Sequence, residues 1–492
     1  MPPKCTSTLS KSRYIRGLQC HKSLWLRTHK PQLSEESAEA RAAFRNGHEV
    51  GELARDLFPG GVLIPYDDLS YDAQIAMTQK ALKTAKVIYE AAFCHDGVFV
   101  KADIIRKTAK GWNLYEVKSS TKVKDINLDD VAVQCHVLSG CGVPLNKAFV
   151  VHINSSYVRK GELVLDELFI KSDVTRDIKA MQGDVVHELS QQKKMLAKRT
   201  CPKIDIGPHC SDPYECDFVG YCWQHIPENS VFDLAGKGVD KFALYREGIL
   251  KIEDVPLDRL KGQQLQQVKL ARSKKTVVGA AGLKEFLKQL HYPLYFLDFE
   301  TFMSAVPLYE GQRPYQQIPF QYSLHYQTRK GGKLKHAEFL AEPDQGPRKA
   351  LLEKLLNDIP DNACILAYYK SFEVSRLQEL AEQFPKHRKK IESIIARTVD
   401  LIVPFRQRHL YSWKQKGSHS IKAVLPAFVP KMSYDGMEIA DGGAAMEAYH
   451  EMCAVADRPK ELAKVRSALL EYCRQDTLAM VRLLEVIEQK AG

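Results

Sequence analysis

Residues 97–120 read GVFVKADIIRKTAKGWNLYEVKSS, which is two apolar runs joined by a short polar turn. We predict a β-hairpin. Side chains alternate between the two faces of a strand, so Glu116 and Lys118 share one face, and strand pairing can bring Asp103 beside them. Two carboxylates and one ammonium group would then converge at one point of the sheet.

This combination favours metal-dependent hydrolysis of phosphodiesters. Two carboxylates bind a hard divalent cation such as Mg2+ or Mn2+, and the cation can lower the pKa of the attacking water. Lys118 would orient that water or stabilise the developing negative charge. For an isolated Glu-x-Lys pattern, the alternative is an ordinary hairpin with exposed charges.

The order of Gly97, Asp103, Glu116 and Lys118 resembles the PD-(D/E)xK nucleases, in particular their RecB-like branch. The resemblance implies a restriction-endonuclease-like α/β core. It also implies a following helix that carries a glutamine of the active site, and DVAVQCHVLSG supplies Gln134 at the expected distance.

We expect helices at about 35–58 and 72–93 before the hairpin. The resemblance implies a further metal ligand on an upstream helix, where FRNGHEVGELARDLFP offers His48, with Glu52 on the same helical face. A structural histidine is the alternative. The predicted strands of this part are 97–105, 112–118 and 147–153.

Cysteines flank the predicted nuclease core on both sides. Cys201, Cys210, Cys216 and Cys222 follow it, separated by gaps of eight, five and five residues, and Cys20 precedes it. Four nearby thiols indicate a zinc site or an iron-sulfur cluster. Zinc sites commonly use gaps of about two to four residues, so the wider spacing favours iron and sulfur, with zinc still open.

This set resembles the RecB-like nucleases that hold a four-cysteine iron-sulfur cluster, including the CRISPR-associated exonucleases. The resemblance implies a 4Fe-4S cluster bound by Cys20, Cys210, Cys216 and Cys222. Cys201 is a substitute candidate, because the gap between the first two C-terminal ligands is longer than the family's usual gap. Such a cluster would act as a structural clasp between the two ends of the domain.

A second acidic set begins on the apolar strand YPLYFLDFE, where Asp298 and Glu300 share one face. Two carboxylates on an apolar strand carry a desolvation cost that a divalent cation would relieve. Further on, Glu373 lies near the start of a predicted helix. In the last predicted helix, about 459–490, Tyr472 and Asp476 stand one turn apart.

These three motifs, in this order, resemble the DnaQ-like (DEDD) exonucleases of the ribonuclease H superfamily, over about residues 291–490. The resemblance implies a ribonuclease H-like α/β domain with two bound divalent cations and with Tyr472 orienting the attacking water. Glu373 departs from the family's aspartate by one methylene. The implied carboxylate ligands are Asp298, Glu300, Glu373 and Asp476.

At 492 residues the chain is longer than one hydrophobic core normally supports, and we predict an α/β multidomain protein. Residues 1–226 would form the RecB-like nuclease with its iron-sulfur clasp. Residues 227–290 would form a basic helical connector that resembles a helix-hairpin-helix module, with a plain spacer as the alternative. Residues 291–492 would form the DnaQ-like 3'-5' exonuclease domain.

The charge balance favours a polyanionic partner. Lys and Arg outnumber Asp and Glu by 71 to 60, for a net charge of +11, although a solvated cationic surface gives the same count. No run of about 18 apolar residues and no apolar signal-peptide core is visible, so we expect a cytoplasmic protein without a membrane partner.

The whole chain resembles a bacterial family that fuses a RecB-like nuclease to a ribonuclease H-like exonuclease. That resemblance implies a metal-dependent nuclease that prefers DNA, with RNA as a second substrate class and a helicase or another repair or defence protein as a partner. One alternative is a nucleic-acid-binding scaffold with one or both sites inactive. Another is an RNA-trimming exonuclease that uses only the C-terminal site.

Overall fold

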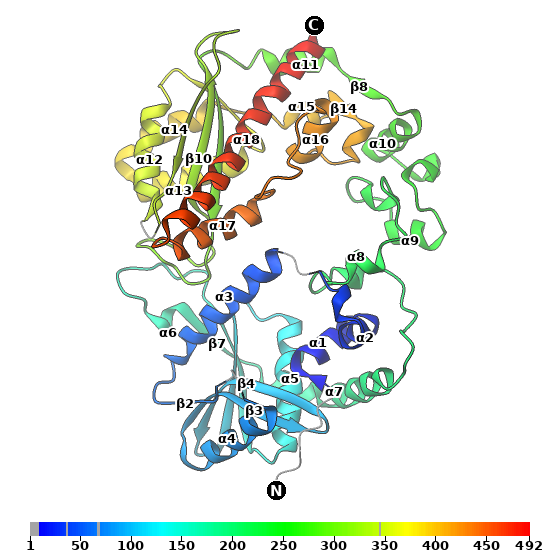
Figure 1. Ribbon diagram of the computed structural model, residues 1–492, viewed down its shortest axis with the longest axis vertical. Helices are drawn as coiled ribbons and strands as arrows, with labels where there is room; N and C mark the ends of the chain where they lie inside the picture. Colours follow the sequence, from blue (N-terminus) through cyan, green and yellow to red (C-terminus); the bar gives the residue numbers. More distant parts are fainter. Residues whose placement is uncertain (1–8, 36–37, 66–68, 344–345) are drawn as a thin grey trace. The chain divides into compact units, whose positions relative to one another are not determined.

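A computed structural model describes four stretches of the chain, residues 9–35, 38–65, 69–343 and 346–492. They form two compact α/β units (Figure 1). Unit 1 contains Met1–His225 and Ser304–Gln316. Unit 2 contains Ile226–Met303 and Gln317–Gly492.

Unit 1 is built on a mixed sheet in the order β2-β3-β4-β5-β6-β7, with β1 paired in parallel to β4. The meander β3-β4-β5 is antiparallel, and β6 lies parallel to β5 after the crossover helix α5 (Asp125–Gly140). The strands are β1 (Leu9–Ser10), β2 (Val62–Leu63), β3 (Val87–His95), β4 (Val98–Thr108), β5 (Gly111–Lys118), β6 (Leu145–Ile153) and β7 (Phe169–Asp173).

Helices cover both faces of this sheet. Apolar side chains of α1, α2, α4, α5 and α7 pack on one face, around Leu114 and Val150. Val50 and Ala54 of α3 pack on the other face, against Tyr115 and Val117. The helices are α1 (Lys11–Gln19), α2 (His21–His29), α3 (Ala38–Arg55), α4 (Tyr71–Thr84), α6 (Leu165–Leu168), α7 (Thr175–Leu196) and α8 (Val219–Cys222).

The prediction of one helix over 72–93 is wrong in its second half. Helix α4 ends at Thr84, and residues 87–95 form strand β3. The run VIYEAAF is almost continuously buried, which suits a strand covered on both faces better than an amphipathic helix.

Unit 2 is built on a second mixed sheet, in the order β11-β10-β9-β12-β13. Strand β10 is antiparallel to both β9 and β11, whereas β12 is parallel to both β9 and β13. The strands are β9 (Leu294–Phe302), β10 (Ile318–Gln327), β11 (Lys335–Leu340), β12 (Cys364–Ala367) and β13 (Thr398–Asp400).

Successive side chains of β9 point to opposite faces of the sheet, and different helices cover each face. Tyr295, Leu297 and Phe299 face α12, α13 and α14. The long helix α18 bonds to β10 on the opposite face, where the buried Thr477 hydroxyl lies 2.7 Å from Ser323 Oγ and 2.8 Å from His325 Nδ1. The helices are α12 (Pro347–Asp358), α13 (Ser371–Gln383), α14 (Arg388–Ala396), α15 (Val403–Arg406), α16 (Ile421–Phe428), α17 (Gly442–Ala454) and α18 (Pro459–Ala491).

The predicted connector, 227–290, belongs to unit 2 and is not a separate unit. Part of it has a small core of its own, which includes Leu244 and Val268. A left-handed Gly248 follows the short helix α9 (Lys241–Arg246), but the next element is a one-turn 3-10 helix, so the expected pair of hairpin helices is not formed there. The other elements are α10 (Gly262–Ser273), α11 (Ala280–Leu287) and the small sheet of β8 (Thr276–Val278) and β14 (Leu410–Ser412).

The predicted C-terminal domain is interrupted as well, because the segment Ser304–Gln316 between β9 and β10 belongs to unit 1. Within unit 1, Ala305 packs beside Phe169 and Tyr157, and the Arg159 guanidinium donates to the Pro307 carbonyl at 2.9 Å. Among the described residues, no helix combines the length and the apolar composition needed to cross a bilayer.

Candidate functional site

The first candidate site lies in unit 1, where strands β4 and β5 meet helix α5 and the first residue of α1. We call it the unit 1 cluster. It contains Lys11, Asp103, Glu116, Lys118, Asp130 and Gln134.

Glu116 is at the centre of this cluster and is almost fully buried. Its Oε1 lies 2.7 Å from the Lys118 ammonium and 2.7 Å from the Lys11 ammonium. Its Oε2 accepts a hydrogen bond from Gln134 Nε2 at 2.7 Å. Lys118 also pairs with Asp130, which Gln134 contacts through its other carboxylate oxygen at 3.1 Å.

Asp103 reaches the cluster because the strands part at this point. Regular pairing between β4 and β5 ends at Ile104, and the Asp103 carboxylate instead accepts the Val117 N–H at 2.8 Å. On the other side, the β3–β4 register skips Glu90, which has a positive φ of 56°. This irregularity leaves Asp103 unpaired in the ladder and near both lysines.

The charges of the cluster perturb one another. Burial raises the pKa of Asp103, while Lys11 and Lys118 oppose that rise and Glu90 adds to it. Burial alone would lower the pKa of Lys118, but Asp130 and Glu116 outweigh it and the pKa is raised. The same balance holds the pKa of Lys11 well above its usual range. Both ammonium groups therefore stay charged.

Two members of the cluster were missed in the sequence. Asp130 stands one helical turn before Gln134, and that spacing could have revealed it. Lys11 has no such local signal. Its place depends on the parallel pairing of Leu9 with Val98, which only the folded chain brings about.

His48 is not joined to the cluster by any hydrogen bond or ion pair that the described residues make. Its side chain is 74% exposed on α3 and pairs with Glu52 at 3.4 Å. Helix α3 packs against Tyr115 and Val117, which alternate along β5 with Glu116 and so lie on the opposite face.

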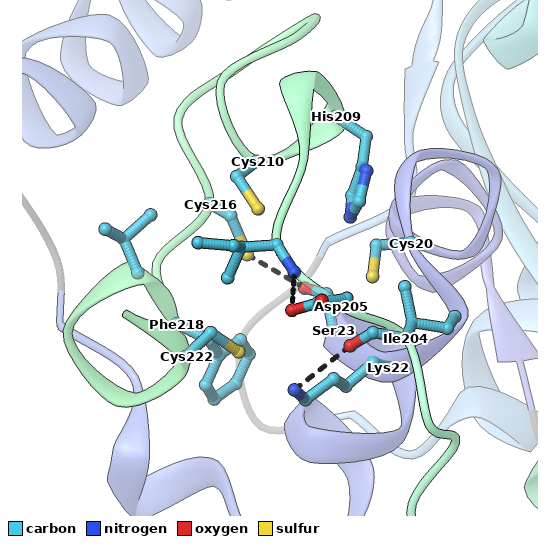
Figure 2. Close-up of a pocket in the computed structure, with 12 residues that line it drawn as sticks. Cys20, Lys22, Ser23, Ile204, Asp205, His209, Cys210, Cys216, Phe218 and Cys222 are labelled. Atoms are coloured by element: carbon cyan, nitrogen blue, oxygen red, sulfur yellow. Dashed lines mark hydrogen bonds between the residues drawn. The ribbon is translucent and has the colours of Figure 1, made fainter. Parts of the chain in front are cut away.

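The predicted cysteines meet in a second place in unit 1, which we call the cysteine pocket. Figure 2 shows the sulfur atoms of Cys20, Cys210, Cys216 and Cys222 around it. Lys22 and His209 also line the pocket. Cys201 is not among the lining residues and packs against the apolar core of unit 1.

Hydrogen bonds fasten the N-terminal helices to the cysteine-bearing loop. Arg16 and Ser34 both bond to the Asp217 carboxylate, the serine hydroxyl at 2.6 Å. Gln19 donates to the carbonyl groups of His209 and Tyr214, at 2.9 and 2.6 Å. Polar contacts therefore hold the parts of the pocket together.

The thiols of the pocket are crowded and partly buried. Burial raises the pKa of Cys20, and the neighbouring Cys216 and Cys210 raise it further, whereas the backbone N–H groups of Ser23 and Lys22 lower it. A bound cation would favour the thiolate forms. A donor set made only of sulfur fits either zinc or an iron-sulfur cluster.

The third candidate site lies in unit 2, and we call it the unit 2 cluster. Asp298 and Glu300 project from one face of β9, Glu373 from the first turn of α13, and Tyr472 and Asp476 from α18. Asp476, Glu300 and Glu373 all lie close enough to Asp298 to raise the pKa of its carboxyl group. The structure thus brings together the residues predicted for this site.

Other contacts shape the unit 2 cluster. Cys473 Sγ lies 3.7 Å from Asp298 Oδ2, and one possible ligand atom from each of Asp298, Glu300 and Cys473 falls within a span of 4.8 Å. The Tyr434 hydroxyl donates to Asp476 Oδ1 at 2.5 Å. The buried Glu373 Oε2 has no hydrogen-bond partner among the described residues.

The carboxylates of this cluster are protonated more readily than usual. Burial and then the charge of Asp476 raise the pKa of Asp298 and of Glu300 well above the ordinary range. Burial raises the pKa of Glu373 to about 8. It raises the pKa of Asp476 to about 6, against the opposing effects of Tyr434, Lys422 and Tyr472. Ionisation of all four carboxylates would therefore leave negative charge that their surroundings do not compensate.

Lys422, Tyr434 and Cys473 were not predicted as members of this site. The Lys422 ammonium lies 5.7 Å from the centre of the Tyr434 ring and 5.8 Å from that of Tyr472. Lys422 and Tyr434 stand far from the other members in the chain and follow no recognisable spacing. Cys473 is adjacent to Tyr472, which is the only signal the sequence offered for it.

Parts of this chain are similar to known proteins. Residues 295–420 match the model of a family described as a domain of unknown function, DUF2779. The matched stretch contains Asp298, Glu300 and Glu373 and ends before Tyr472 and Asp476.

Two relatives come from mycoplasmas. A protein of Mycoplasma pneumoniae named "Uncharacterized protein MG366 homolog" is 26% identical over 228 residues, which cover 43% of this chain and 34% of that protein. "Uncharacterized protein MG366" of Mycoplasma genitalium is 25% identical over 210 residues, which cover 39% of this chain and 32% of that protein. The chain thus spans about a third of the length of these relatives.

The carboxylates of the unit 2 cluster predict how stability depends on pH when divalent cations are removed. The folded pKa values of Glu373 and Asp476, about 8 and about 6, lie above the ordinary values of 4.5 and 3.8. The folded chain therefore keeps protons that the unfolded chain has lost. The resulting stability is present at low pH and is lost as the pH rises through about 6 and then about 8.

Hydrogen–deuterium exchange of β9 and α18 peptides in the chelator-treated full chain measures this effect. After correction for intrinsic rates, we expect weaker protection at about pH 9 than at about pH 6. Glu373→Gln should flatten the profile, while Glu382→Gln, at an exposed position of the same helix, should not. Protection that is constant or rises across this range would contradict the prediction.

Proposed function

We propose that this chain is a metal-dependent nuclease that hydrolyses phosphodiester bonds of nucleic acid, DNA in preference to RNA, at both the unit 1 cluster and the unit 2 cluster. One observation carries the proposal. Four carboxylates from β9, α13 and α18 converge in unit 2, and burial raises the pKa of each of them.

Burying several ionised carboxylates close together is energetically unfavourable unless a cation binds between them. The residues present fit this role, since Asp298 and Glu300 share a face and the buried Glu373 Oε2 has no hydrogen-bond partner among the described residues. A divalent cation, when bound, would activate water and stabilise the leaving oxygen.

Side chains of the cluster would position the metal ligands, the attacking water and the phosphate. Tyr434 holds one oxygen of Asp476 at 2.5 Å, which fixes the direction of that carboxylate. The Tyr472 hydroxyl, which favours the ionised form of Asp476, would orient the attacking water. Lys422 supplies positive charge beside Glu300 and Asp476 and would favour the approach of a phosphate.

The architecture of unit 2 supports a ribonuclease H-like domain. Its sheet order, with one antiparallel strand between β9 and the edge strand β11 and with β12 and β13 parallel to β9, is the order expected for that fold. Strand β9, which carries Asp298 and Glu300, is the central strand of this sheet.

Unit 1 supports a PD-(D/E)xK core in the same way. The antiparallel meander β3-β4-β5, the helix α5 and the parallel strand β6 follow one another in the expected order. Asp103 and Glu116 would hold a divalent cation, Lys118 would act on the water or the phosphate, and Gln134 would fix the Glu116 carboxylate.

We propose further that the cysteine pocket holds a 4Fe-4S cluster. Cys20, Cys210, Cys216 and Cys222 surround one pocket, although Cys20 is separated from the other three by most of unit 1 in the sequence. A cluster bound there would link the N-terminal helices to the loop that follows α7, and so stabilise the folded unit.

Replacement of Cys216 by serine tests this cofactor. We expect the anaerobically purified full chain to absorb in the visible range and to contain iron and sulfide, and Cys216→Ser to lose both. Cys201→Ser is the matched control and should keep them, because Cys201 does not line the pocket. Zinc in a colourless wild-type protein, or an unchanged spectrum in Cys216→Ser, would contradict a 4Fe-4S cluster.

The nuclease activity is tested with end-labelled single-stranded DNA and RNA in Mg2+ or Mn2+, comparing wild type, Lys118→Met and Asp298→Asn. Each substitution should remove one product pattern, with a loss of about 10²–10³-fold in rate, because Lys118→Met removes a cation that stabilises developing charge and Asp298→Asn removes a ligand of the divalent cation.

Other outcomes select the alternatives. Cleavage of RNA that survives Lys118→Met and disappears in Asp298→Asn would indicate an RNA-trimming enzyme that uses only unit 2. Binding of either strand without any cleavage by wild type would indicate a scaffold and would overturn the proposed activity.

A further inference from the structure

Lys11 occupies an unexpected place in the unit 1 cluster. Its ammonium lies 2.7 Å from Glu116 Oε1 and 3.4 Å from Asp130 Oδ1, and its side chain is 23% exposed. We propose that Lys11 is a second substrate-binding cation of this site. It holds Glu116 while no metal is bound, leaves it when a divalent cation enters, and then contacts a phosphate of the nucleic acid. This inference rests on the proposed function of unit 1.

Both oxygens of the Glu116 carboxylate already have partners. Both ammonium groups, of Lys11 and Lys118, share its Oε1, and Gln134 occupies its Oε2. A divalent cation that binds this carboxylate therefore has to displace a donor already present. Two ammonium groups and a divalent cation around one oxygen would also repel one another.

Lys11 is the donor that can leave. Lys118 is the last residue of β5, where its backbone pairs with His152 of β6, and its ammonium lies closer to Asp130 than that of Lys11 does. Lys11 is the first residue of α1, and its long side chain can swing without moving a strand. Asp130 stays neutralised by Lys118 after that movement.

A phosphate is the partner that the displaced ammonium would meet. The positive end of a helix lies at its N-terminus, and α1 begins at Lys11 with Ser10 as its cap. The N-terminus of α1 and the displaced Lys11 ammonium are both positive, so they repel each other. An anion that lies between them would be stabilised by both. A nucleic-acid phosphate bound to the metal at Asp103 and Glu116 would arrive beside both.

The competing explanation is an ion pair that only anchors α1 to the sheet. The two explanations predict opposite signs for metal binding. Loss of an anchor would loosen the cluster and weaken both metal binding and cleavage. Loss of a competitor for Glu116 would strengthen metal binding, while cleavage and phosphate contact would be weakened.

The experiment uses the full chain with Asp298→Asn and Asp476→Asn in the background, so that metal binding and cleavage report on unit 1. Lys11→Met and Lys11→Gln are compared with Lys11→Arg, which keeps the charge. Lys147→Met is the control, because Lys147 is an exposed lysine of unit 1 that pairs with Asp173.

We expect Lys11→Met and Lys11→Gln to bind Mn2+ several-fold more tightly and to cleave single-stranded DNA about 10²-fold more slowly. In Ca2+, the slope of log affinity against log salt should fall by about 0.7, the value for one lost phosphate contact on a single strand. Lys147→Met should stay near the background protein in all three measurements. Lys11→Arg, which keeps the charge, should restore most of the cleavage rate and of the salt slope that the neutral variants lose.

Weaker Mn2+ binding by both neutral variants, or an unchanged salt slope, would overturn the inference and leave Lys11 as an anchor. The proposed function of unit 1 is judged separately by Lys118→Met in the same background. If that variant still cleaves as the background does, unit 1 is not the nuclease. If it loses cleavage while the Lys11 variants do not, only the inference fails.

Discussion

Both candidate sites depend on carboxylates that are buried close to one another, where their negative charges repel and are poorly hydrated. In unit 2, Asp298 and Glu300 project from the same face of β9, and Asp476 of α18 is held beside them by Tyr434. In unit 1, two lysines neutralise Glu116 and Asp130. The two clusters therefore meet the same electrostatic cost differently, and the excess of negative charge in unit 2 makes that site the stronger candidate for binding a cation.

The short segment at the start of the described chain serves unit 1 in three ways. Leu9 adds a parallel strand beside β4, Lys11 enters the unit 1 cluster, and Cys20 lines the cysteine pocket at the far end of α1. One nine-residue helix thus joins the two candidate sites of this unit. A change at the cysteine pocket that moved α1 would also move the ammonium at Glu116.

Local periodicity predicted the parts of these sites that lie within one element. Alternation along a strand placed Glu116 beside Lys118, and helical spacing placed Tyr472 beside Asp476. Contacts between distant segments escaped prediction, since Lys11, Lys422 and Tyr434 become members only through tertiary packing. The helix predicted over 72–93 is wrong at residues 87–93 for a related reason, because a strand buried on both faces has no polar side to reveal its period.

We propose that one chain holds two separate sites for divalent cations. Crystals of the full chain soaked in Mn2+ test it most directly through anomalous scattering, which locates the metal without relying on activity. We expect one peak or a close pair beside Asp298, Glu300 and Asp476, and another beside Asp103 and Glu116. Saturating Mn2+ that leaves both carboxylate clusters without an anomalous peak would contradict it.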